Sequence, residues 1–212
     1  MAVYSQQEET ANFLTHAAGT LLSIAALSIL VTLAGIEGDV WRIVSFSIYG
    51  ATLVILYLIS TLYHAFRSER LKAVFRVLDH ISIFLLIAGT YTPFTLVNLR
   101  GPWGWSIFGV IWGLAIAGIV FKLFMTGRWQ VFSSLVYIMM GWVVLIAFKP
   151  LFASVDLSGV LWLIAGGMAY TLGVIFYSMK TIPYHHAIWH CFVLLGSTCH
   201  FFAIYFHVLP MP

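Results

Sequence analysis

The chain has 212 residues, of which 62% are hydrophobic and only 8% are charged. A soluble domain carries roughly 25% charged residues, so this chain cannot cover a water-facing surface. The mean hydropathy of +1.00 excludes an ordinary soluble enzyme, a disordered regulator and a nucleic-acid-binding protein, despite a net charge of +3. We therefore predict an integral membrane protein that has membrane lipids, and no nucleic acid, as partners.

Apolar runs of membrane-spanning length recur along the whole chain. A helical span needs about 17 to 25 apolar residues, and seven runs meet this requirement: 13–36, 41–64, 78–99, 103–124, 131–148, 157–179 and 186–208. Short turn segments separate them, among them Glu37-Gly38-Asp39 and Lys149-Pro150. None of the runs alternates polar with apolar residues as the strand of a membrane barrel does. The predicted fold class is all-α: one domain over residues 1–212, a bundle of seven transmembrane helices.

Basic residues are unevenly divided between the two sides of this predicted bundle. Seven fall on the side of the N-terminus: Arg67, Arg70, Lys72, Arg76, Lys122, Arg128 and Lys180. Three fall on the other side: Arg42, Arg100 and Lys149. Loops rich in Lys and Arg face the cytoplasm, so we predict a cytoplasmic N-terminus. The first run follows acidic rather than basic residues, and we expect it to remain as a helix instead of being removed as a signal peptide.

Polar residues are concentrated at the ends of three of these runs. Ser60 and His64 lie four residues apart at the end of the second run, and His186 and His190 lie four apart at the start of the seventh. Residues four apart share one face of a helix. Asp79 opens the third run, so the predicted topology brings all five residues to the cytoplasmic end of the bundle. Ionisable residues inside a span usually face the bundle interior or a cavity and indicate a functional site.

Three histidines beside a carboxylate are suited to a catalytic zinc site, which has three protein ligands and one open position. We predict that His64, His186 and His190 bind Zn²⁺. Asp79 then accepts a hydrogen bond from a zinc-bound water, which is a nucleophile at neutral pH. Ser60 orients Asp79 or donates to a developing oxyanion. A single histidine in a span is more often an interhelical hydrogen-bond donor, and it is the paired spacing together with Asp79 that favours the metal.

Other polar residues have simpler interpretations. A polar stripe marks the start of the first run: Glu8, Glu9, Asn12 and His16. For this stripe we expect helix capping and a hydrogen bond to the site, with metal ligation by Glu9 or His16 as the alternative. His200 lies about 15 Å along the helix axis from His190, too far to share its metal, and is expected to be a buried hydrogen-bonding residue.

Taken together, these motifs resemble the hemolysin III family, the bacterial branch of the progestin and adipoQ receptor family. The motifs are Glu and Asn ahead of His16, Ser60-x-x-x-His64, Asp79 and His186-x-x-x-His190. The resemblance covers essentially the whole chain and implies seven helices, a cytoplasmic N-terminus and a location in the bacterial plasma (inner) membrane. It also implies a zinc ion held by the three matching histidines. The wider superfamily includes alkaline ceramidases, so the resemblance implies hydrolysis of a lipid amide, and bacterial members are linked to membrane homeostasis.

The sequence is therefore compatible with three alternative functions. The first is a zinc-dependent hydrolase that cleaves an amide or ester bond of a lipid near the cytoplasmic leaflet. The second is a non-enzymatic sensor or homeostasis factor with a structural zinc, although structural zinc sites are usually closed by four ligands. The third is a pore-forming haemolysin, which needs a water-lined stripe across the membrane. Outside the cytoplasmic third the spans offer mainly Ser, Thr, Gly and His200, which ranks this function last.

Overall fold

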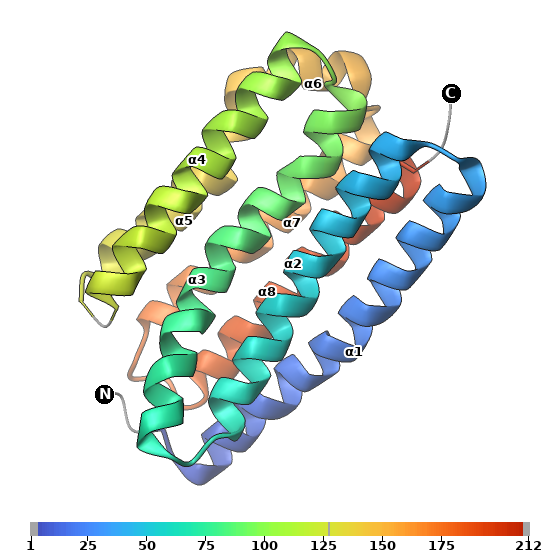
Figure 1. The fold of residues 1–212 in the computed structure, drawn as a ribbon. Helices are drawn as coiled ribbons and strands as arrows, with labels where there is room; N and C mark the ends of the chain where they lie inside the picture. Colours follow the sequence, from blue (N-terminus) through green and yellow to red (C-terminus); the bar gives the residue numbers. More distant parts are fainter. Residues whose placement is uncertain (1–3, 127, 210–212) are drawn as a thin grey trace.

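The computed structural model describes residues 4–126 and 128–209, and its regular elements are all helices (Figure 1). In chain order they are α1 (Gln6–Glu37), α2 (Val40–Ala65), α3 (Glu69–Pro93), α4 (Pro102–Met125), α5 (Gln130–Gly141), α6 (Phe148–Ser154), α7 (Leu157–Ser178) and α8 (His185–His207). A π-helical segment, Phe94–Asn98, follows α3, and a 3₁₀ segment, Val143–Ala147, joins α5 to α6. The long helices run side by side along one direction, and α1 begins at the end of the bundle opposite to the one where α8 ends.

Six helical segments of the described residues are long and apolar enough to cross a membrane: α1, α2, α4, Val131–Ser154, α7 and α8. The fourth of these combines α5, the 3₁₀ segment and α6. The chain is therefore a multi-pass, all-helical membrane protein, as the sequence predicts. The predicted third span is not among the six, because five of the first eleven residues of α3 are charged and lower its hydropathy.

Two predicted boundaries differ from those of the structure. The third helix begins at Glu69 rather than at residue 78, so Asp79 lies about three turns inside α3 instead of opening it. The charged segment before Asp79 is rich in good helix formers, which extend the helix beyond its apolar part. Lys149-Pro150, predicted as a separator, lies in the first turn of α6. Proline is tolerated there because the first turn has no intrahelical bond to lose.

The interior face of α1 consists largely of small and polar residues that recur every three or four positions: Asn12, His16, Gly19, Ser23, Ala26, Leu30 and Ala34. Large side chains such as Leu21 and Ile36 face outward, 72% and 77% exposed. Small residues let membrane helices approach closely. At Gly19, a Cβ atom would lie 2.4 Å from the Tyr57 ring. α1 therefore packs directly on α2, and it also contacts α8.

One end of the bundle collects the residues of the candidate site. α1 and α8 begin there, and α2 ends there (Figure 1). We call it the N-terminal end of the bundle. Because α1 packs against both α2 and α8, its first turns lie against the last turn of α2 and the first turns of α8. The first residues of α1 and of α8 thereby become neighbours, although almost the whole chain separates them in sequence.

Candidate metal centre

Three buried histidines converge at the N-terminal end of the bundle. His64 lies in the last turn of α2, and His186 and His190 lie in the first two turns of α8. One ligand nitrogen from each lies within 4.8 Å of the other two. Two nitrogens bound to one zinc ion lie at most about 4.2 Å apart, twice the Zn–N bond length. The three histidines could therefore bind one metal ion after a small shift of their side chains.

Hydrogen bonds from α1 orient two of these imidazoles. Nδ1 of His64 lies 2.7 Å from a carboxylate oxygen of Glu9, and Nδ1 of His190 lies 3.2 Å from the backbone carbonyl oxygen of Asn12. A carbonyl or an ionised carboxylate can only accept a hydrogen bond, so the imidazole proton is held on Nδ1 in both rings. The lone pair of Nε2 is then available to a metal, the usual arrangement for histidine ligands.

The third imidazole has a partner just ahead of α1. Nδ1 of His186 lies 3.3 Å from the hydroxyl oxygen of Tyr4. Burial raises the pKa of Tyr4 well above its usual range, so this hydroxyl stays neutral and its oxygen can accept from Nδ1. Nε2 of His64 and Nε2 of His186 are both buried without a hydrogen-bond partner. Leaving a buried polar atom unpaired costs about 1–3 kcal/mol, and a metal ion would satisfy both atoms, so the residues fit a metal.

The expected roles of the polar stripe are confirmed for three of its members. Glu8 and Ser5 form a capping box at the start of α1, with Ser5 Oγ accepting from the Glu8 backbone N–H at 3.2 Å. Glu9 and Asn12 provide the hydrogen bonds that tie α1 to His64 and to α8. These residues anchor α1 to the histidine cluster through capping and hydrogen bonding.

Glu9 and His16, the alternative metal ligands, both lie outside the described group of residues that could hold a metal ion. The carboxylate of Glu9 is engaged by Nδ1 of His64 and by the ammonium group of Lys72. The ring of His16 stacks on that of His190, with centroids 3.4 Å apart and planes 16° apart. His16 lies outside the group of three that could hold a metal, and it supports the position of His190 by packing.

A polar cavity of about 110 Å³ lies beside the three histidines. Its lining includes Ser60, Asp79, His186 and His190. The hydroxyl of Ser60 is buried and has no hydrogen-bond partner, whereas Asp79 is partly exposed. The fifth predicted residue, His64, lies against His186 and His190, with ring centroids 5.1 and 5.2 Å away. The structure thus brings all five residues to one place, with Asp79 reaching it from the middle of α3.

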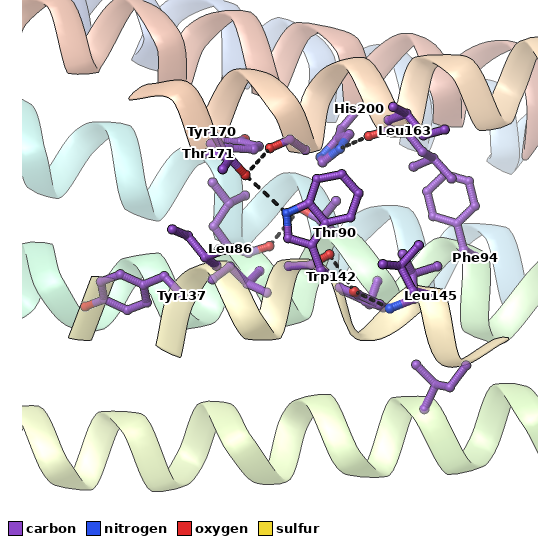
Figure 2. A pocket seen from close by; sticks show the side chains of 18 of the residues that line it. Leu86, Thr90, Phe94, Tyr137, Trp142, Leu145, Leu163, Tyr170, Thr171 and His200 are labelled. Carbon is purple, nitrogen blue, oxygen red and sulfur yellow. Dashed lines mark hydrogen bonds between the residues drawn. The ribbon is translucent and has the colours of Figure 1, made fainter. Parts of the chain in front are cut away.

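A second, apolar cavity of about 170 Å³ adjoins the first (Figure 2). Aliphatic and aromatic side chains line it, among them Leu86, Phe94 and Trp142. His200 lies at this cavity and its Nε2 is 3.3 Å from the carbonyl oxygen of Leu163, which confirms the expected hydrogen bond, although the residue is only partly buried. The two cavities share a set of lining residues: Leu56, Ile83, Tyr137, Val174, Trp189 and Val193. A polar chamber with potential ligands therefore lies next to an apolar one.

Two residues of the site escaped the sequence reasoning. Tyr4 precedes the first apolar run, and no pattern in the sequence pairs it with His186. The sequence marks Lys122 only as one of the basic residues that set the topology, yet it is 1% exposed and lines the polar cavity. Its position within the apolar run 103–124 was the available signal, because lysine inside a span is rare and functional by default.

These observations define a class of protein: a multi-pass helical membrane protein with a buried three-histidine centre at one end of its bundle. The family described as Haemolysin-III related matches residues 4–201, and the chain belongs to this family. The resemblance inferred from the motifs is confirmed.

Individual relatives cover nearly the whole chain. Hemolysin-3 of Bacillus cereus is 48% identical over 204 residues, which is 96% of this chain and 93% of the relative. The Hemolysin-3 homolog of Bacillus subtilis (strain 168) is 46% identical over 210 residues, 99% of each chain. The Monocyte to macrophage differentiation factor of Homo sapiens is 29% identical over 214 residues, 97% of this chain and 86% of the human protein.

Proposed function

We propose that this protein is a zinc-dependent hydrolase that cleaves an amide or ester bond of a membrane lipid. The observation that carries the proposal is the group of three buried histidines beside a cavity lined by Asp79 and Ser60. Neutral imidazoles suit zinc, and three protein ligands leave a position open for substrate or water, as in catalytic zinc sites. A fixed Nδ1 proton on His64 and on His190 leaves their Nε2 atoms as candidate ligands, and Nε2 of His186 is buried without a hydrogen-bond partner.

The proposal includes a seventh span and an orientation. α3 packs between α2 and α4 and contributes Asp79 to an interior cavity, which supports its crossing the membrane with the six more apolar segments. The seven-to-three distribution of basic residues supports a cytoplasmic N-terminus. The candidate metal centre then faces the cytoplasm of the bacterial plasma membrane.

The residues around the cavity suggest a reaction sequence. A zinc ion held by the histidines would supply Lewis-acid chemistry, polarising a carbonyl and acidifying water. Asp79 takes a proton from the attacking water, whose oxygen bonds to the carbonyl carbon of the lipid. Ser60 donates its unpaired hydroxyl hydrogen to the oxyanion that forms. When the bond to nitrogen or oxygen breaks, Asp79 returns the proton to the leaving group, giving a fatty acid and an amine or alcohol.

The adjoining apolar cavity supports a lipid substrate. Its lining is almost entirely hydrocarbon and aromatic (Figure 2), and it shares residues such as Leu56 and Trp189 with the polar cavity. An acyl chain in the apolar cavity would bury its methylene groups, each worth about 0.8 kcal/mol, and would leave the adjacent carbonyl beside the histidines.

A second candidate function is a non-enzymatic sensor of membrane state. One observation favours it: the histidines come from α2 and α8, and two of them hydrogen-bond to α1. A metal ion there would hold these helices together, and its loss would loosen their packing.

The hydrolase function predicts fatty-acid release that depends on zinc. Purified full-length protein in liposomes is expected to release fatty acid from a ceramide or a phospholipid, and a chelator is expected to lower the rate by about a hundredfold or more. Added zinc should restore the rate. Mass spectrometry of the released acid provides the measurement. A zinc-loaded preparation that releases no fatty acid from either lipid class would contradict the hydrolase and leave the sensor as the better account.

The contact between Glu9 and His64 predicts a difference between two adjacent glutamates. Glu9→Ala is expected to weaken zinc affinity about 10–100-fold, because the hydrogen bond that orients His64 is lost. Glu8→Ala is the matched control, since Glu8 caps α1 and contacts no ligand. Competition with a chelator of known affinity gives the measurement. Equal affinities for the two variants would contradict the role of Glu9. Glu9 also forms an ion pair with Lys72 of α3, and Lys72→Met removes this ion pair while leaving the contact between Glu9 and His64.

A further inference from the structure

The polar cavity contains a buried lysine that the proposed reaction does not use. Lys122 lies in the last turn of α4, is 1% exposed and lines the cavity. Within the described residues, its ammonium group makes no hydrogen bond or ion pair. Lysine at a helix C-terminus usually interacts with the last carbonyls or reaches bulk water, whereas this side chain lines an interior cavity. Its charge therefore requires another explanation.

A second cation lies near Lys122 and increases the excess of positive charge. Arg76, from α3, lines the same cavity and is the charged group that repels the Lys122 ammonium. Nε of Arg76 is buried without a partner. Asp79 is the acidic residue among the described lining residues, and Glu9 is already bound to His64 and Lys72. Two cations thus face one carboxylate, and a bound divalent metal would increase the excess further.

Charged groups inside a membrane protein are normally paired, because an isolated charge is poorly solvated there. The groups around Lys122 suit an anion with several oxygens. Tyr177 of α7 also lines the cavity, and its phenol is a hydrogen-bond donor. A guanidinium group and an ammonium group beside a hydroxyl donor are typical partners of phosphate and carboxylate oxygens. The apolar cavity next to this site indicates that the anion is carried by a hydrocarbon chain.

We propose that Lys122 and Arg76 form an anion subsite that binds the oxyanion of a membrane lipid, a headgroup phosphate or a fatty-acid carboxylate. The inference deepens the proposed function, since it gives the lipid at that cavity a negative charge. Binding without turnover tests it separately. A wild type that hydrolyses lipid but binds charged and neutral lipids equally would overturn this inference alone. A wild type that prefers anionic lipid but hydrolyses none would overturn only the enzymatic proposal.

The test compares lipids of equal chain length that differ in charge. Full-length protein in detergent is titrated with phosphatidic acid, diacylglycerol, palmitate and inorganic phosphate, and binding is measured by calorimetry. The wild type is expected to bind the anionic lipid at least about tenfold more tightly than diacylglycerol, the usual scale of a charge-assisted hydrogen bond. Lys122→Met should abolish this preference and Lys122→Arg should retain it. Lys149→Met is the matched control, because Lys149 is exposed and lies outside the cavity.

Each outcome decides the proposal. A Lys122-dependent preference for phosphatidic acid identifies a headgroup phosphate, and the same dependence with palmitate identifies a carboxylate. Equal binding of charged and neutral lipids by the wild type would overturn the subsite, as would equal effects of Lys122→Met and Lys149→Met. Inorganic phosphate bound as tightly as phosphatidic acid would overturn its assignment to a lipid. Should Lys122→Met fail to fold, Arg76→Gln against the exposed Arg70→Gln in α3 makes the same comparison.

Discussion

Replacing His64, His186 and His190 together by alanine is expected to lower the zinc content of the purified protein from about one ion per chain to background. The physical reason is that these side chains are the described group that could hold a metal, and two of their Nε2 atoms are buried without another partner. Elemental analysis by mass spectrometry, normalised to protein concentration, gives the measurement. The effect is expected to be the largest of any substitution in the chain.

A neighbouring histidine provides the control for this experiment. His185 is buried at the start of α8, directly before His186, but it lies outside the group of three. His185→Ala should therefore retain the wild-type zinc content while removing a buried imidazole from the same turn. Equal metal content in the wild type and the triple variant would refute the assignment of the metal site.

Asp79→Asn is expected to lower the rate of lipid hydrolysis by about 10²–10⁴-fold while zinc content stays unchanged. The amide cannot take the proton that Asp79 removes from water, and general acid–base groups contribute factors of this size. The side chain keeps its size and lies outside the candidate ligand group, so the metal should remain. Fatty-acid release and elemental analysis on the same preparation separate the two quantities.

This variant also distinguishes the two candidate functions. A sensor with a structural metal requires the histidines but not Asp79, so His64→Ala should abolish its function and Asp79→Asn should leave it intact. Glu69→Gln is a suitable control, since Glu69 is an exposed carboxylate in the first turn of the same helix. Unchanged hydrolysis in Asp79→Asn would contradict the role of Asp79 as the base.

The histidine cluster could be predicted because its signals are local. The spacing of four between His186 and His190 places both on one face of a helix, and the lengths of the apolar runs place His64 at the same end of the bundle. Both signals depend on helix geometry alone. The interior of α1 could be anticipated in the same way, since Asn12 and His16 recur at helical spacing.

The features that escaped prediction depend on tertiary contacts or on local backbone choices. Hydropathy detects where an apolar segment ends but not where its helix ends, so Asp79 was expected at the start of α3. The irregular backbone of 142–147 and the short helix around Pro150 depend on packing. The spacing of apolar residues in the sequence does not indicate such packing. Tyr4 pairs with a histidine 182 residues away, and Lys122 is buried by neighbours from other helices. The pairing of Tyr4 leaves no signal in the local sequence, whereas the burial of Lys122 is indicated only by its position within the apolar run 103–124.

The hydrogen bond between α1 and His190 has a consequence for the biosynthesis of the protein. Asn12 and His190 are separated by 178 residues, so at typical elongation rates α1 emerges from the ribosome about 9 to 36 seconds before its partner. Throughout that interval the polar face of α1 must remain in or near the bilayer without the imidazoles that later cover it. The candidate metal centre can be assembled only after α8 has been synthesised, so metal binding there would be a late event that reports whether α8 has been inserted.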